Sequence, residues 1–268
     1  MLLILVRGLM RKLTLHRFTI KQFGKFVGGG GALLVRWTSD WDCNDETEFY
    51  WCIKDDAFDL QAIKAKRRYE INKGIKNFDV RIIDPKEYID EIYEVYLESL
   101  KGYPVGTTPL TRDTICETAL TGWSQEDCRF FAAFDRNTEK MCGYADVYVR
   151  NRFIPISSMH CNVNSEKKNV NFSLVYGIVE WFNPLTKKGC YLCDGARNVL
   201  HETNFQDFLI KYLGFRKAYC KLHLAYKPGI GWIVRLLFPF RKLIAKIKKL
   251  NMVSSVLKME AWSRGLSE

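Results

Sequence analysis

The densest polar stretch in the apolar part of the sequence runs from Asp194 to Asn204 and reads DGARNVLHETN. It follows a short segment, 190–193, with the composition of a buried strand, and it leads into an expected helix at about 202–213. In open α/β sheets, ligands bind at the carboxyl ends of the strands. A histidine in such a stretch can act as a general base because its ordinary pKa is near 6.5. The stretch is therefore the first candidate for acid–base chemistry.

Each polar residue of this stretch has a chemical and a structural interpretation. His201 can be the base or can bond to backbone where the helix begins. Glu202 can orient that histidine or complement the helix dipole. Asp194 can hold a substrate amine or cap the turn, and Arg197 can bind a phosphate or carboxylate or form a surface ion pair. His160, near the end of an expected strand at 153–161, is the second candidate for the base, with a structural role as the alternative.

A mixed α/β sheet is the fold that would position these residues. Alternating apolar runs and turn residues predict strands, and apolar residues spaced by three and four predict helices. The expected strands are 48–53, 78–83, 129–134, 141–149, 153–161, 190–193 and 216–226, and the expected helices are 55–73, 85–100, 111–120, 170–182 and 202–213. Hairpins make this sheet antiparallel through 129–161, whereas the β-α-β step around 153–193 makes it parallel there. The four glycines Gly28–Gly31 are followed by a β-type run, which predicts a turn or loop that leads into a further strand.

This order, with Tyr212-Leu213-Gly214-Phe215 closing the last helix, resembles the GNAT superfamily of acyltransferases over residues 76–228. The segment from Lys66 to Gly74 is similar to the FemAB-like branch, whose members carry extra N-terminal structure. We therefore expect three parts: a β/α extension over 1–75, a GNAT-like domain over 76–228 and a basic amphipathic helical tail over 229–268. For the basic cluster at 64–73, the sequence leaves open a helix-dipole role and a phosphate-binding face.

The resemblance implies transfer of an acyl group from acyl-CoA, or of an aminoacyl group from tRNA, to an amine or hydroxyl. The donor would lie where strands 153–161 and 190–193 separate, with its phosphates at the start of the helix near Val170. Residues that would hold it are polar and follow the two strands: Asn164, Lys167, Lys168, Asn171, Ser173, Arg197 and Asn204. Two departures put coenzyme A in doubt. The stretch 164–173 has no glycine, and Ile210 stands where a general-acid tyrosine is frequent.

The formal net charge of +11 is concentrated at the two ends of the chain. Residues 1–36 hold seven Lys and Arg and no acid, residues 229–268 hold eight against two acids, and the middle is almost neutral. This distribution excludes a general nucleic-acid packager. In the tail, Trp, Leu, Ile and Phe recur at helical spacing between Lys and Arg, with Pro239 as an expected kink. Such a helix is typical of an anionic membrane surface, and a helix packed on the domain or a dimer contact is the alternative.

The nine cysteines are odd in number and scattered, which predicts free thiols and a cytoplasmic protein. Cys190 and Cys193 have no second pair at metal spacing, so we expect no metal. The apolar run 1–6 is too short to span a membrane. Together these features predict an acyltransferase at the inner face of the membrane that modifies an amine on a small or lipid-linked cell-envelope or surface-polysaccharide precursor. Two alternatives stay open: a non-catalytic membrane adaptor with a GNAT-like shape, and basic ends that hold tRNA as donor.

Overall fold

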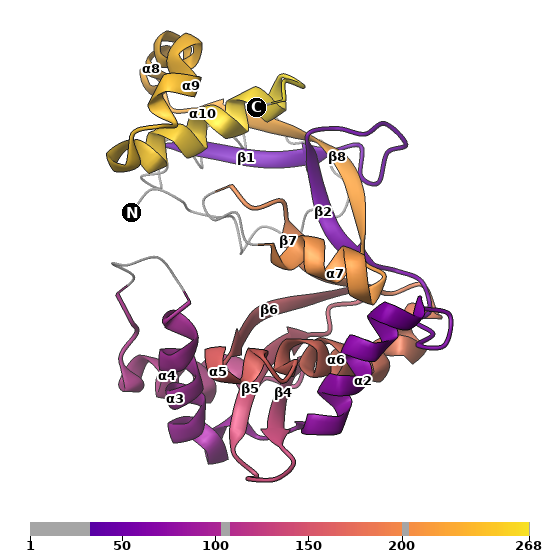
Figure 1. Cartoon of the computed structure of the whole chain (residues 1–268). Coiled ribbons are helices and arrows are strands. Elements are labelled where there is room, and N and C mark those ends of the chain that lie inside the picture. Colours follow the sequence, from indigo (N-terminus) through magenta and orange to yellow (C-terminus); the bar gives the residue numbers. More distant parts are fainter. Residues whose placement is uncertain (1–32, 103–107, 200–203, 268) are drawn as a thin grey trace. The chain divides into compact units, whose positions relative to one another are not determined.

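A computed structural model describes residues 33–102, 108–199 and 204–267 (Figure 1). Its strands are β1 (Leu34–Ser39), β2 (Phe49–Lys54), β3 (Phe78–Ile82), β4 (Cys128–Asp135), β5 (Met141–Tyr148), β6 (Phe153–Cys161), β7 (Tyr191–Ala196) and β8 (Arg216–Tyr226). Its α-helices are α2 (Ala65–Asn77), α3 (Ile89–Leu100), α4 (Arg112–Thr118), α5 (Val163–Glu166), α6 (Val170–Thr186), α7 (Phe205–Leu213), α8 (Ile230–Leu237), α9 (Arg241–Ile244) and α10 (Asn251–Ser263). Short turns of other helix types are η1 (Pro85–Tyr88), η2 (Ala119–Trp123), η3 (Phe238–Phe240) and η4 (Lys248–Leu250).

The strands form the mixed sheet that the sequence predicts. They hydrogen-bond in the order β1-β8-β2-β7-β6-β5-β4-β3. The hairpin neighbours β4, β5 and β6 are antiparallel, and β6 and β7 are parallel on either side of the crossover through α6. This is the arrangement that the resemblance to the GNAT superfamily implies.

The chain divides into two compact units, and each unit is built from separate stretches of sequence. The larger unit consists of Cys52–Gly195 and Asn204–Lys217, and the smaller one of Met1–Trp51, Ala196–Thr203 and Ala218–Glu268. Within the smaller unit the structure describes 33–51, 196–199 and 218–267.

Helices cover both faces of the sheet in the larger unit (Figure 1). Along β4, Phe131 and Ala133 belong to the core beneath α6, whereas Phe130, Ala132 and Phe134 belong to the core beneath α3. This follows from the period of two in a strand, which sends successive side chains to opposite faces. Because both faces of β4 and β5 are buried, these strands are almost continuously apolar.

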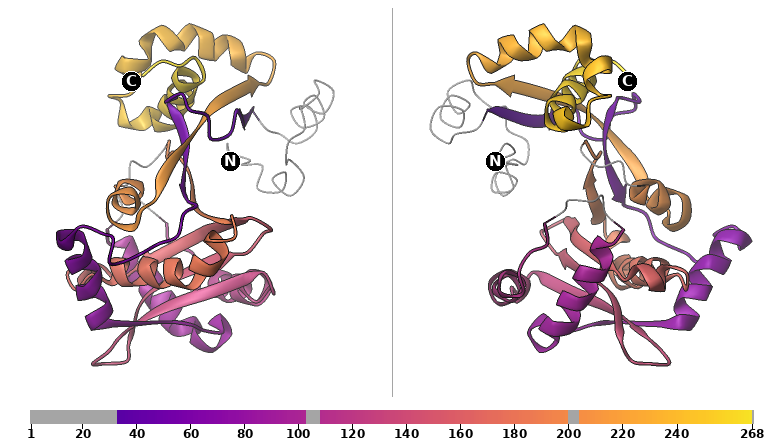
Figure 2. Two further views of the ribbon diagram at one scale, coloured as in Figure 1. Left: turned by 90° about the vertical axis from the view of Figure 1, so that its right-hand side faces the viewer. Right: turned by 60° about the vertical axis from the view of Figure 1, so that its left-hand side comes forward.

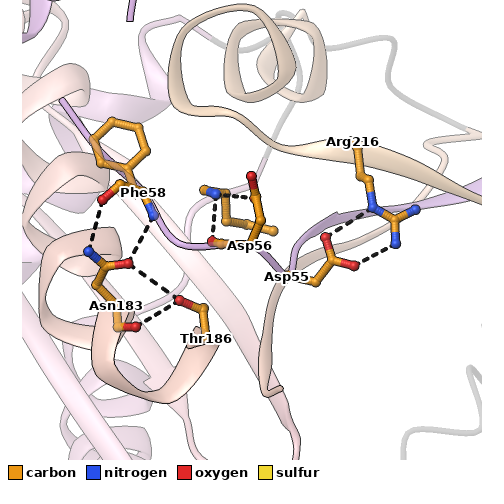
Figure 3. Close-up of polar contacts among 7 residues, drawn as sticks. Asp55, Asp56, Phe58, Asn183, Thr186 and Arg216 are labelled. Carbon is orange, nitrogen blue, oxygen red and sulfur yellow. Dashed lines mark hydrogen bonds and ion pairs between the residues drawn. The ribbon is translucent and has the colours of Figure 1, made fainter. Parts of the chain in front are cut away.

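The expected helix over 55–73 is wrong at both ends, because α2 begins at Ala65 and runs through Gly74 to Asn77. Residues 55–58 are instead held in place by side chains from elsewhere in the larger unit (Figure 3). The Asn183 side chain accepts a hydrogen bond of 2.9 Å from the Phe58 backbone N–H and donates one of 2.9 Å to the Phe58 carbonyl. Arg216 makes a two-pronged ion pair with Asp55, with distances of 3.0 and 2.5 Å.

Helix α6 is also longer than expected, since it ends at Thr186 rather than at 182 and contains Pro184. A proline inside a helix removes one backbone hydrogen bond. Here the Thr186 hydroxyl donates 2.9 Å to the Asn183 carbonyl, and the Cys190 N–H donates 3.0 Å to the Leu185 carbonyl. These bonds to backbone carbonyls stabilise the last turn despite the proline.

In the smaller unit, β1 and β8 pair antiparallel from Leu34↔Tyr226 to Ser39↔Lys221. Helix α10 contributes Met259 and Trp262 to the core over this pair, with Leu34, Phe49 and Leu222. The tail is helical as predicted, but it is divided into α8, η3, α9, η4 and α10, and the views in Figure 2 show these pieces gathered together. The first break falls at Pro239, which supplies no N–H to continue α8.

Candidate active site

The parallel strands β6 and β7 pair only at their beginnings. The paired residues run from Phe153↔Tyr191 to Pro155↔Cys193, after which β7 continues to Ala196 and β6 to Cys161. The rest of β6 pairs with β5 on its other side. The strands therefore stop pairing at the carboxyl-terminal end of the parallel step, where ligands of open α/β sheets bind. This is the place at which the resemblance puts the acyl donor.

Asp194 is the first residue after the last paired position of β7. Its carboxylate accepts a hydrogen bond of 3.2 Å from the side-chain amide of Gln206, which is buried in α7. Burial raises the pKa of Asp194 to about 7, and the hydrogen bond from Gln206 opposes this shift in part. A carboxyl group with a pKa near neutrality exchanges a proton readily, as a general base must. Gly195 follows with φ of +109° and open space where a Cβ would stand.

His160 lies on the part of β6 that pairs with β5 and not with β7, opposite Tyr144. Its Nδ1 is 2.9 Å from the Ser99 hydroxyl, and its ring contacts those of Tyr96 and Tyr144 at centroid distances of 5.2 Å each. Burial lowers the pKa of His160 to about 4, so the imidazole is neutral at pH 7. Nearby, the buried carboxylate of Asp146 accepts a short hydrogen bond from the Ser158 hydroxyl. Burial also raises the pKa of Asp146.

The beginning of α6, where the donor phosphates were expected, is in contact with helix α2. Asn169 precedes the helix with φ of 68° and donates side-chain hydrogen bonds to the Glu70 carboxylate at 2.7 Å and to the Glu70 carbonyl at 2.9 Å. A Cβ on Gly74 would lie 2.6 Å from the Asn169 carbonyl oxygen and 3.0 Å from the Ser173 backbone nitrogen. Ser173 is accordingly buried. The Glu70 carboxylate and helix α2 thus lie next to the N-terminal end of α6.

The other expected donor-binding residues of the larger unit are dispersed. Lys168 forms an ion pair of 2.8 Å with Asp135, and the Lys167 carbonyl accepts a hydrogen bond from Lys73. Asn164 is exposed on α5. The Asn171 side chain accepts a hydrogen bond from the neighbouring Phe172 N–H, and Asn204 precedes α7, with its carbonyl bonded to the Phe208 N–H.

Arg197 belongs to the smaller unit, where several contacts fix its position. Its guanidinium donates to the Glu48 carbonyl at 2.6 Å and pairs with the Glu48 carboxylate at 3.1 Å. It also lies 4.2 Å from the centre of the Trp262 ring. Arg197 thus makes an ion pair and a stacking contact within the smaller unit. His201 and Glu202 lie outside the described residues.

Sequence reasoning missed the two partners that define this region. Gln206 is a buried polar residue on an otherwise apolar helix face, and that pattern could have identified it. Glu70 and Asn169 are 99 residues apart in the sequence, so no local sequence pattern predicts their contact. Within the described part of the chain, no group of three or more His, Cys, Asp and Glu is arranged to hold a metal ion. All nine cysteines are free thiols.

No family model matches the chain. No curated protein matches it either.

Among solved structures the chain is similar to the C-terminal domain of a putative lysylphosphatidylglycerol synthetase from Agrobacterium fabrum, at 15% identity and a TM-score of 0.47 over 77% of this chain and 66% of that one. It is similar to FemX at 10% identity and a TM-score of 0.46, over 66% of this chain and 60% of that one. The ribosomal-protein-S18-alanine N-acetyltransferase from Escherichia coli matches 42% of this chain and 62% of its own, at 12% identity and a TM-score of 0.32. The chain thus spans less than two thirds of the length of each of these three proteins.

Proposed function

We propose that this protein is an acyltransferase that uses the Asp194 carboxylate as its general base. The single observation that carries this proposal is the position of Asp194, directly after the point where the parallel pairing of β6 and β7 ends. The pKa of about 7 suits it to accept a proton at neutral pH. His160 is the weaker candidate, because a histidine with a pKa of about 4 attracts a proton less strongly.

In the proposed reaction, the nitrogen of an acceptor amine attacks the carbonyl carbon of the donor. A C–N bond forms, and the C–S bond of an acyl-CoA or the C–O ester bond of an aminoacyl-tRNA breaks. The carboxylate takes the proton that the nitrogen loses, and the leaving thiol or hydroxyl regains a proton when the electron pair moves to it. The acceptor we infer is an amine on a cell-envelope or surface-polysaccharide precursor that is available in the cytoplasm.

The donor is the less determined partner of this reaction. A coenzyme A pyrophosphate at the start of α6 would approach the Glu70 carboxylate, which is unfavourable for an anion. Lys167 is exposed beside this terminus and can contribute positive charge. This setting favours an aminoacyl-tRNA, whose phosphates can bind elsewhere on the protein, over acyl-CoA.

The test measures transfer of a radiolabelled acyl or aminoacyl group to isolated envelope fractions, with acetyl-CoA, longer acyl-CoAs and charged tRNA offered in turn. Asp194→Asn should lower kcat about 100-fold or more, since general-base catalysis contributes roughly 10²–10⁴. Asp207→Asn, an exposed acid on α7, is the matched control and should keep full activity. If His160→Gln abolished transfer and Asp194→Asn did not, the base would be His160.

A non-catalytic adaptor is the second candidate function. It is favoured by the contact between Glu70 and Asn169 at the start of α6 and by the absence of glycine from 164–173. Thermal-shift measurements separate the two candidates, because a bound donor raises the unfolding temperature by mass action. A protein that no donor stabilises, and whose cellular phenotype survives Asp194→Asn together with His160→Gln, is an adaptor.

A further inference from the structure

The tail carries a row of large apolar side chains on its surface. We call Trp232, Ile233, Leu236, Phe240, Leu243 and Ile247 the docking face. Trp232 is 75% exposed, Leu236 72% and Leu243 63%. From Trp232 onward these residues recur every three or four positions of the sequence, and all six side chains are exposed on the successive pieces α8, η3 and α9 and the residues after them. Exposed apolar residues gathered in this way indicate an interaction site, whereas single ones do not.

The docking face is not used for packing within the tail, because a different set of side chains forms the contacts there. Val234, Phe238 and Ile244 are buried and pack against Leu257 and Ala261 of α10. The contact of α8 with α10 is visible in Figure 2. The tail segment is therefore apolar on two sides. One side is used within the smaller unit, and the other is covered by nothing in the described part of the chain.

The charge around the docking face has one sign. The sequence has no Asp or Glu between Asp207 and Glu260. Four exposed cations lie within three residues of docking-face side chains: Arg235, Lys242, Lys246 and Lys249. An exposed apolar stretch whose sequence neighbours carry only positive charge is complementary to a surface that is apolar inside and anionic outside, as an anionic phospholipid layer is.

We propose that the docking face inserts into the headgroup region of an anionic phospholipid membrane. Trp232 and Phe240 reach the acyl boundary, and the surrounding Lys and Arg contact lipid phosphates. Within the described residues no helix is long and apolar enough to span a bilayer. This inference concerns where the protein lies and holds whether or not it transfers acyl groups.

The test uses the full chain and sedimentation with vesicles of phosphatidylcholine alone or mixed with phosphatidylglycerol. The wild type should bind the mixed vesicles and lose much of this binding as salt rises, because salt screens the charges. Replacing four docking-face residues (Trp232→Ser, Leu236→Ser, Phe240→Ser and Leu243→Ser) should weaken binding at least about tenfold at every salt concentration. Replacing the cations (Arg235→Gln, Lys242→Gln, Lys246→Gln and Lys249→Gln) should remove the preference for phosphatidylglycerol, also by about tenfold or more.

The matched control replaces two exposed leucines of the larger unit, Leu110→Ser and Leu120→Ser, and should bind as the wild type does. Circular dichroism checks that each variant is folded. Point variants replace a truncation here, because removing 229–268 would take Met259 and Trp262 out of the core. Equal binding by wild type and apolar variant, or no binding to either vesicle, overturns the proposal. A wild-type dimer that the apolar variant converts to monomer, without vesicle binding, assigns the docking face to a second copy instead.

Discussion

The Glu70 carboxylate accepts a 2.7 Å hydrogen bond from the side-chain amide of Asn169, the residue that immediately precedes α6. This bond joins α2 to the N-terminal end of α6, where the positive end of a helix dipole would otherwise be available to an anionic ligand. The protein thus supplies its own carboxylate next to the terminus. Four residues later on α2, Gly74 allows the backbones of the two helices to come close.

Gly74→Ala should destabilise the larger unit. Its Cβ would lie 2.6 Å from a backbone oxygen, and overpacking of this kind costs about 1 to 3 kcal/mol, more than the roughly 1 kcal/mol that alanine gains in a helix. Urea denaturation measures the change. Gly122→Ala is the control, since its Cβ would meet nothing closer than 3.8 Å, and it should be neutral or stabilise by up to about 1 kcal/mol. Equal effects of the two substitutions would contradict the close packing at Gly74.

Asp194 and His160 should give opposite slopes to stability against pH. The pKa of Asp194 is raised from 3.8 to about 7, so the fold favours the protonated acid and loses stability as pH rises from about 4 to 7. The pKa of His160 is lowered from 6.5 to about 4, so the fold favours the neutral ring and gains stability as pH rises from about 4 to 6.5. Each effect is up to about 3 to 4 kcal/mol, and in the wild type they oppose one another.

Single variants should separate the two contributions to the pH dependence of the free energy of unfolding. Asp194→Asn removes the carboxyl effect, so its free energy of unfolding relative to the wild type should rise between pH 4 and 7. His160→Gln removes the histidine effect, so its free energy of unfolding relative to the wild type should fall between pH 4 and 6.5. Urea titrations at four pH values across this window measure both slopes. Parallel curves for the two variants would mean that neither group is desolvated as the structure has it.

Asn183→Ala should destabilise the protein by about 1 to 3 kcal/mol, because it leaves the N–H and the carbonyl of Phe58 without their side-chain partner. Asn164→Ala, on the exposed helix α5, is the matched control and should change stability by less than about 0.5 kcal/mol. Chemical denaturation measures both. If Asn183→Ala were no less stable than Asn164→Ala, the segment 55–58 would not depend on the two hydrogen bonds from Asn183.

We expect Arg197 to contribute to the stability of the smaller unit. Arg197→Ala removes the ion pair with Glu48 and the stacking on Trp262, and we expect it to cost about 1 to 3 kcal/mol. Arg197→Lys keeps the charge without the planar group and should lie between alanine and wild type. Thermal unfolding monitored through tryptophan fluorescence measures the series. Unchanged stability with loss of donor binding would instead return Arg197 to the role of an anion-binding residue.

The sheet was well predicted from sequence because its signals are local. The limits of β6 and β8 match the expected 153–161 and 216–226, since a hairpin turn precedes β6 and Gly214 ends the helix before β8. The position of Asp194 after a buried strand was likewise readable from its neighbours. The segment 55–64 and the ends of α2 were not, because Asn183 and Arg216 hold that segment from more than 120 residues away. The tail shows the same limit, because its sequence shows one apolar stripe and only the packing against α10 reveals that the segment has a second apolar side.

The pairing of β1 with β8 has a consequence for synthesis. Leu34 pairs with Tyr226, so β1 leaves the ribosome long before its partner exists. At roughly 5 to 20 residues per second, the wait is on the order of 10 to 40 s, whereas most of the larger unit can already collapse around α6. During that time the half-apolar strand β1 has an open edge. A nascent chain stalled before residue 216 should therefore expose β1 to proteases.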